Sequence, residues 1–249
     1  MITTTQLPRI IGHRGAKGLA PENTLAGFRA AADAGARWVE FDVQLSSDDV
    51  PVLFHDDDIE RLSGDLGRFT TLPLAIIKNL EVGSHFSPAF SGEGVPTFAE
   101  AMTELASLDL GANVEIKLPD DASDEMAEKT ARVIADVVRS DWPDVLPPPL
   151  LSSFDARALR ALRDTAPDLA RAFIFSKIPD GWMETALGLA CGGVHVAGHR
   201  VSEKLVGEAH DAGLLVRAYT INERTQAEAL FAMGVDGIFT DFPDQLAGL

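Results

Sequence analysis

Charged residues spaced two apart interrupt otherwise apolar runs of this sequence. The two pairs are Glu40 with Asp42 and Glu115 with Lys117. Because side chains two residues apart on a β-strand point to the same face, each pair would project from one side of its strand. Such buried charges are costly unless something compensates them. If Glu40, Asp42 and Glu115 converge, they suit a hard divalent cation, Mg²⁺ or Ca²⁺, since carboxylate oxygen is the ligand that such ions prefer.

A purely structural interpretation of these acids is also open. Arg14 and Lys117 could neutralise them in a buried ion-pair network that needs no metal. However, three acids outnumber these two bases, and an imidazole is also expected nearby. We therefore favour a metal site.

Two histidines are expected on either side of the acids. His13 ends an apolar run, and Gln44–Phe54 is a predicted hairpin whose turn centres on Ser47 and Asp48. An antiparallel register with that centre places His55 opposite Glu40. A lone half-buried histidine is usually structural. Two histidines that flank a carboxylate cluster could instead act as base and acid on either side of a phosphoryl group.

The other histidines in these patterns give weaker signals. His210 falls within a predicted helix, where we expect it to pack or to face solvent. His195 lies within a predicted strand and His199 follows it, and neither has an acidic partner that the sequence identifies.

The candidate residues lie at the ends of short apolar runs that alternate with helical patterns along the whole chain. The runs are bounded by Gly, Pro or Asp, as expected for strands buried on both faces. The predicted strands are Arg9–His13, Trp38–Val43, Asn113–Lys117, Leu150–Phe154, Ala172–Phe175, Gly193–Val196, Leu215–Thr220 and Asp236–Thr240. The predicted helices are Thr24–Ala34, Thr97–Leu108, Ser123–Ser140, Asp155–Thr165, Asp180–Ala190, Ser202–Ala212, Glu223–Met233 and Pro243–Gly248.

This strict alternation predicts an α/β protein, a (β/α)₈ TIM barrel, in which catalytic side chains come from the carboxyl ends of the strands. An open doubly wound sheet is the alternative. Helix boundaries have their own signals. Asn23 or Thr24 can cap the first helix and Ser202 the sixth, while Gly35, Gly213 and Gly234 stand where helices end in a left-handed residue.

A long interval between the second predicted strand and the second predicted helix interrupts the alternation of strands and helices. We interpret residues 57–95 as an insertion that contains Gly and Pro but no long helix. An insertion at the carboxyl end of a barrel strand falls on the active-site face. The chain is therefore predicted to be a single domain, 1–249, with this small insertion at the barrel mouth.

Composition narrows the classes of partner. The chain has 21 Lys and Arg against 38 Asp and Glu, a formal net charge of −17, which argues against nucleic acid or an anionic membrane. Its one cysteine excludes an internal disulfide and a cysteine-rich metal site. No run approaches the roughly 20 apolar residues of a membrane span, and Met1–Arg9 lack the apolar core of a signal peptide. We expect a soluble cytoplasmic protein with a small-molecule partner, no stable membrane association and no assigned oligomeric state.

A series of short motifs, in order along nearly the whole chain, resembles the glycerophosphodiester phosphodiesterase family. Each alone is weak, but together they are specific. They are His13-Arg14-Gly15, Pro21-Glu22-Asn23-Thr24, Glu40-Phe41-Asp42, His55-Asp56, Glu115-Ile116-Lys117 and the stretch Gly234–Pro243. Residues Gly83–Pro96 also look like the insertion region of this family.

The resemblance implies a TIM barrel that hydrolyses glycerophosphodiesters to sn-glycerol 3-phosphate and an alcohol with a divalent metal ion. It makes His13 and His55 the acid/base pair. It likewise implies that Glu40, Asp42 and Glu115 are metal ligands, and that Arg14 and Lys117 contact the phosphate. We expect the neighbouring glycerol hydroxyl to attack first and form a cyclic phosphate that water then opens.

Two positions depart from the family pattern. Tyr219 stands where the family usually has Trp, and His85 stands where Trp is common. We expect both to line the substrate mouth and to affect substrate preference.

Three other functions fit the sequence less well. A phosphodiester lyase of the sphingomyelinase D or phosphatidylinositol phospholipase C kind is typically secreted, which the sequence disfavours. A catalytically inactive binding barrel would normally lack a histidine or a metal ligand, and none is lost here. A metal-dependent isomerase or aldolase would not need two histidines beside its carboxylates.

Overall fold

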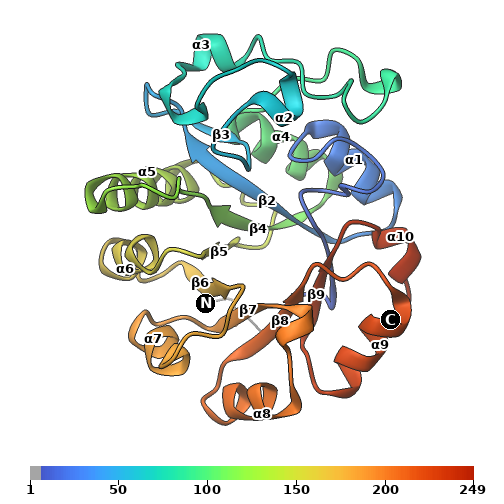
Figure 1. Cartoon of the computed structure of the whole chain (residues 1–249), viewed down its shortest axis with the longest axis vertical. Coiled ribbons are helices and arrows are strands. Elements are labelled where there is room, and N and C mark those ends of the chain that lie inside the picture. The colour runs from blue at the N-terminus through green and yellow to red at the C-terminus, as the bar shows by residue number, and fades with distance from the viewer. Residues whose placement is uncertain (1–6) are drawn as a thin grey trace.

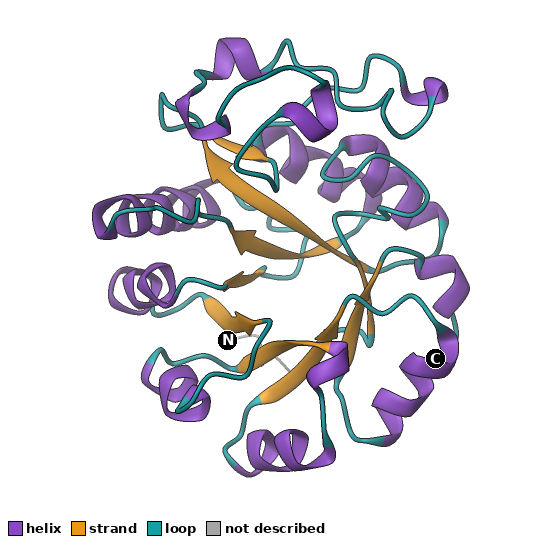
Figure 2. Cartoon of the chain, in the orientation of Figure 1, coloured by secondary structure: helices purple, strands orange, loops and turns teal. Residues whose placement is uncertain are grey.

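A closed barrel of parallel strands lies at the centre of the molecule (Figures 1 and 2). The computed structural model describes residues 7–249, so most of Met1–Arg9 lies outside it. The parallel strands in this part are β1 (Ile10–Gly12), β2 (Trp38–Leu45), β4 (Gly111–Ile116), β5 (Leu150–Ser153), β6 (Ala170–Phe175), β7 (Gly193–Ala197), β8 (Leu215–Tyr219) and β9 (Gly237–Thr240). Because β1 pairs with both β9 and β2, the sheet closes. The predicted TIM barrel is confirmed, and the open sheet is wrong.

Helices surround the barrel, as Figure 2 shows. They are α1 (Leu25–Asp33), α4 (Phe98–Leu108), α5 (Asp124–Asp141), α6 (Ala156–Thr165), α7 (Trp182–Gly188), α8 (Glu203–Asp211), α9 (Arg224–Ala232) and the short α10 (Pro243–Leu246). Several predicted boundary residues act as expected. The hydroxyls of Thr24 and Ser202 accept hydrogen bonds from the first turns of α1 and α8. Gly35, Gly213 and Gly234 have positive φ.

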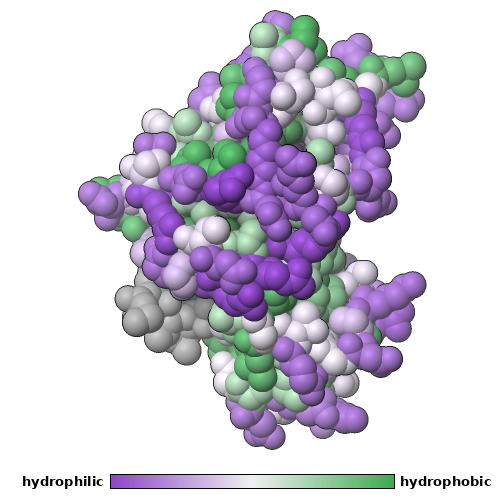
Figure 3. Space-filling model, turned by 90° about the vertical axis from the view of Figure 1, so that its left-hand side faces the viewer, coloured by the Kyte–Doolittle hydropathy of each residue, from purple (hydrophilic) through white to green (hydrophobic). Residues whose placement is uncertain are grey.

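The main apolar core fills the space between the sheet and these helices. Phe28 of α1, Phe41 of β2 and Phe98 of α4 are all buried, and their rings are in contact. The barrel interior has its own small apolar cluster, which includes Trp38 and Phe239. On the face that Figure 3 shows, hydrophilic side chains gather near the middle, with smaller hydrophobic patches above and below them. Within residues 7–249, no helix combines the length and apolar character needed to cross a membrane.

The predicted hairpin is present, but its register differs by one residue from our expectation. Strand β3 (Pro51–Leu53) pairs antiparallel with β2, and Val43 lies opposite Leu53. The pattern centres on Asp48, so the expected pairing of Glu40 with His55 is wrong. The loop has three residues rather than two because Ser46 and Val50 are hydrogen-bonded and Asp49 adopts a left-handed conformation.

Residues 57–95 form short elements beyond the carboxyl end of β2 (Figure 1). These are α2 (Glu60–Ser63), a 3₁₀ turn at Phe69–Thr71, α3 (Leu74–Ile77) and a second 3₁₀ turn at Pro88–Phe90. The segment and the adjoining hairpin share an apolar cluster, in which the rings of Phe54 and Phe69 stack with centroids 4.3 Å apart. This separate cluster explains how the segment is ordered without a long helix.

Candidate active site

A pocket of about 180 Å³ opens at the carboxyl end of the barrel strands. Eight of the nine residues predicted for the site line it. The full lining is His13, Arg14, Glu40, Asp42, His55, Asn113, Glu115, Lys117, Phe154, Ile174, His195, Tyr219, Thr220 and Phe239.

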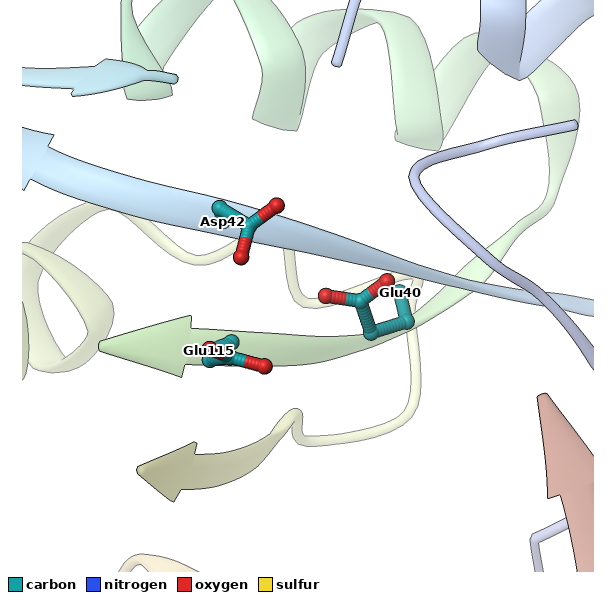
Figure 4. A group of neighbouring side chains, drawn as sticks. All are labelled: Glu40, Asp42 and Glu115. Carbon is teal, nitrogen blue, oxygen red and sulfur yellow. The ribbon is translucent and has the colours of Figure 1, made fainter. Parts of the chain in front are cut away.

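Three buried carboxylates form the charged wall of this pocket. Glu40 and Asp42 project from β2, and Glu115 projects from the neighbouring strand β4, where it is the register partner of Asp42. One oxygen of each lies within 4.8 Å of the others, and Figure 4 shows the three groups side by side. Their exposed fractions are 4%, 1% and 8%. All three face one region because period-two alternation and parallel register put them on the inner surface of the barrel.

Two cations offset part of this charge. The Nζ of Lys117 lies 2.9 Å from Glu115 Oε1 and 3.7 Å from Asp42 Oδ1. The Nε of Arg14 lies 3.4 Å from Asp42 Oδ2, and its backbone N–H donates to Glu40 Oε2 at 2.9 Å. The ion-pair network that we considered is therefore present, but these two cations leave one of the three carboxylates without a counter-charge.

The three carboxyl groups have pKa values that are shifted in different directions. Burial, together with repulsion from Asp42 and Glu115, raises the pKa of Glu40 well above its ordinary value. Burial also raises the pKa of Glu115, against the opposing effect of Lys117. For Asp42, burial alone would raise the pKa, but Lys117 and Arg14 outweigh it and the pKa falls. A divalent cation held by oxygen ligands fits this cluster, because it would supply the positive charge that the protein lacks there.

His13 stands at the end of β1 with one ring nitrogen engaged. Its Nδ1 lies 2.7 Å from Asp241 Oδ1, and Asp241 accepts a second hydrogen bond from Asn222 Nδ2 at 2.9 Å. Its Nε2 lies 4.0 Å from Glu40 Oε2. Burial lowers the pKa of His13 despite the hydrogen bond to Asp241. The carboxylate thus orients the imidazole and leaves Nε2 toward the acids.

His55 follows β3 and is held in the same manner. Its Nδ1 lies 2.6 Å from Asp56 Oδ1, and its ring lines the pocket. The incorrect hairpin register does not remove it from the site: the paired region ends at Leu53, and His55, two residues later, still lines the pocket.

The turn after β1 explains why a glycine follows His13 and Arg14. Arg14 and Gly15 both have positive φ, at 48° and 85°. A Cβ atom on Gly15 would lie 2.7 Å from the carbonyl carbon of Gly27, so only glycine fits. The tight turn brings the Arg14 side chain to Asp42 and to Glu22, whose Oε1 accepts from Arg14 Nη1 at 2.6 Å.

Several pocket residues were not among our predictions. Asn113 lies two residues before Glu115 on β4, so the same alternation that identified Glu115 could have found it. His195, for which we found no acidic partner, is buried with its ring centroid 4.8 Å from that of Phe239. Burial and the nearby Arg217 lower the pKa of His195 well below its ordinary value. The remaining lining residues have no ionisable side chain, which is the feature that identified the acids. They are Phe154, Ile174, Thr220 and Phe239.

Three histidines lie outside the pocket lining. His85, predicted to line the substrate mouth, is exposed in the inserted segment, so its position gives no support to a substrate contact. His199 is exposed, and His210 lies partly exposed on α8 as expected, 2.9 Å from Asp236.

Comparison with known proteins gives consistent matches. Residues 13–245 match the Glycerophosphoryl diester phosphodiesterase family. A glycerophosphodiester phosphodiesterase from Caldanaerobacter subterraneus is 30% identical over 241 residues, which cover 96% of each chain. The structure of an Oleispira antarctica phosphodiesterase in complex with the product sn-glycerol-3-phosphate aligns with a TM-score of 0.91 and 37% identity, over 96% of this chain and 95% of that one. The fold is also that of a glycerophosphodiester phosphodiesterase from Agrobacterium tumefaciens, with a TM-score of 0.78 and 24% identity.

The carboxylate cluster should lower the stability of the metal-free fold. Replacing Glu40 with the isosteric amide (Glu40→Gln) should raise the free energy of unfolding in EDTA at pH 7 by roughly 1–3 kcal/mol, because it removes one buried repelling charge. An acid whose pKa is raised by folding loses native-state stability as the pH rises above its ordinary value, here 4.5. The gap between variant and wild type should therefore close as the pH falls toward that value.

Urea unfolding of both proteins across this pH range measures the effect. Glu128→Gln makes the same chemical change at an exposed position on α5 and should leave the stability unchanged. A Glu40→Gln protein that is less stable than wild type at pH 7 would contradict the electrostatic account.

Proposed function

This chain belongs to the glycerophosphoryl diester phosphodiesterase family, and we propose that it hydrolyses glycerophosphodiesters to sn-glycerol 3-phosphate and an alcohol. The observation that carries the proposal is one pocket in which three carboxylates, two cations and two oriented imidazoles meet. The relative from Oleispira antarctica, which holds sn-glycerol-3-phosphate, supports the same product.

We assign the divalent metal to Glu40, Asp42 and Glu115. Their oxygen-only donor set suits Mg²⁺ or Ca²⁺ better than softer ions. When bound, such an ion stabilises negative charge on the phosphoryl oxygens.

Arg14 and Lys117 are assigned to the substrate phosphate. Both are held at the edge of the carboxylate cluster by ion pairs, with side chains that are 11% and 19% exposed. Their charges make part of the pocket attractive to an anion although the whole chain carries a net charge of −17. Donors that are already in position stabilise charge as it develops on the phosphoryl group without reorganising.

His13 and His55 are assigned to proton transfer. Each has its Nδ1 beside a carboxylate, which favours the tautomer with a free lone pair on Nε2. One imidazole accepts the proton of the attacking hydroxyl at Nε2, and the other, in its protonated imidazolium form, donates its Nε2 proton to the oxygen of the departing alcohol.

We further propose that the attacking group is the glycerol hydroxyl next to the phosphate ester. This hydroxyl is tethered to the phosphorus, so its attack avoids the entropy cost of capturing a water molecule. The product of this step is a cyclic phosphate, which water then opens to sn-glycerol 3-phosphate.

Tyr219 is assigned to the alcohol part of the substrate. It lines the pocket from the end of β8, and its ring centroid lies 6.0 Å from that of Phe154. Phe154 is 42% exposed, so the two rings give the mouth an apolar edge suited to carbon atoms of the substrate.

Two phosphodiesters test the function and the route together. Glycerophosphocholine, with Mg²⁺ or Ca²⁺ added, should release sn-glycerol 3-phosphate. An analogue without the neighbouring hydroxyl should inhibit competitively but turn over slower by roughly 10²-fold or more. Absence of sn-glycerol 3-phosphate would overturn the function, whereas normal turnover of the analogue would overturn only the cyclic route.

The histidine pair gives a separate prediction. His13→Ala and His55→Ala should each lower kcat by about 10²–10⁴-fold, with much smaller effects on KM. Since both histidines serve one sequence of proton transfers, the double variant should be little worse than either single variant.

Steady-state kinetics on glycerophosphocholine measures these effects. His210→Ala is the matched control, because His210 lies on the outer helix α8 and outside the pocket lining. If either pocket variant kept wild-type kcat, that histidine would have no role in proton transfer.

A further inference from the structure

One arginine of the inserted segment joins two acids that lie behind the pocket. Arg61, on α2, donates from Nε to Asp56 Oδ2 at 2.5 Å. Its two terminal nitrogens donate to both oxygens of Glu22, at 2.7 and 3.0 Å. Arg61 itself does not line the pocket, and its side chain is 45% exposed.

Each of these acids holds one residue of the candidate site. Asp56 accepts from Nδ1 of His55 at 2.6 Å, through the oxygen that Arg61 does not use. Glu22 accepts from Nη1 of Arg14 at 2.6 Å. A single carboxylate therefore separates Arg61 from each of two pocket side chains. Asp56 lies between Arg61 and the imidazole of His55, and Glu22 lies between Arg61 and the guanidinium of Arg14.

Because Glu22 is buried, its negative charge has to be offset by cations close to it. Glu22 is 4% exposed, and its charge is matched by Arg14, Lys17 and Arg61. Lys17 is the most distant of the three, at 3.6 Å. Without Arg61, Glu22 would depend mainly on Arg14. The guanidinium of Arg14 would then be drawn toward Glu22 and away from Asp42, 3.4 Å from its Nε.

Loss of Arg61 would affect His55 in a different way. Asp56 is fixed by its bond to Arg61, and without that bond its carboxylate could rotate and release the imidazole. A lysine could not replace the arginine fully, because an ammonium is a point charge while a planar guanidinium can bind two carboxylates at once.

We propose that Arg61 is a positioning residue that fixes His55 and Arg14 together. The inserted segment then contributes to the reaction through this side chain, from outside the pocket. The proposal rests on the proposed function, because it assumes that His55 moves a proton and that Arg14 contacts the phosphate.

Substitutions in the inserted segment test it. Arg61→Ala should lower kcat/KM on glycerophosphocholine by roughly 10- to 100-fold, the usual effect of removing a group that orients a site residue. Arg61→Lys should recover only part of this loss. Arg68→Ala is the matched control: Arg68 lies in the same segment and pairs with exposed Asp121, so its removal should change the kinetics less than twofold.

Combination with His55→Ala separates positioning from a general weakening of the fold. Because Arg61 acts on kcat through His55, adding Arg61→Ala to His55→Ala should lower kcat little further, yet should still raise KM through Arg14. If Arg61→Ala proves unfolded by circular dichroism, Arg61→Lys, which keeps the charge and the aliphatic stem, is used in the same cycle.

The outcomes are distinct. Wild-type kcat and KM in the folded Arg61 variant, or kcat losses that multiply in the double variant, would overturn the proposal while leaving the proposed function intact. A wild-type enzyme that releases no sn-glycerol 3-phosphate from any glycerophosphodiester would overturn the proposed function, and this proposal with it.

Discussion

The convergence of three carboxylates from two neighbouring strands, at the carboxyl end of the barrel, is the constraint on which the rest of the site depends. Glu40, Asp42 and Glu115 are buried within 4.8 Å of one another, and their mutual repulsion has to be offset locally. Lys117 on β4 and Arg14 in the turn after β1 supply two of the charges required. The strained Arg14-Gly15 backbone is explained by this need, because it delivers both a backbone N–H and a guanidinium to the acids.

A second set of acids stands behind the first and holds its basic neighbours. Asp241 binds His13, Asp56 binds His55, and Glu22 binds Arg14. The two sets act in opposite ways. The inner acids face the pocket with charge that the protein does not balance, whereas the outer acids are fully partnered and fix the groups that would meet the substrate. Such a site stores unfavourable electrostatic energy in the fold, which a ligand of the right charge relieves.

The sequence alone allowed the barrel and the inner set to be predicted, because both depend on local periodicity. Alternation of strands and helices determines the fold class, and a spacing of two places Glu40 beside Asp42 on one face. The outer set could not be predicted in this way. The contact between His13 and Asp241 joins positions 228 residues apart, and it depends on barrel closure. The hairpin register failed for a different reason: the left-handed Asp49 adds a third loop residue, and nothing in Ser-Ser-Asp-Asp distinguishes a loop of three residues from a turn of two. The position of His85 depended on the path of the inserted segment, which has no regular period.

Direct measurement of cation binding tests the central claim that the cluster of Glu40, Asp42 and Glu115 binds a divalent ion. Isothermal titration calorimetry would compare Mg²⁺ and Ca²⁺ binding to the wild type, to Glu40→Gln and to the surface control Glu128→Gln. The account predicts saturable binding of about one ion per chain by the wild type and the control, and an affinity at least 10-fold lower in Glu40→Gln. Equal affinity in Glu40→Gln, or no binding of either ion by the wild type, would contradict it.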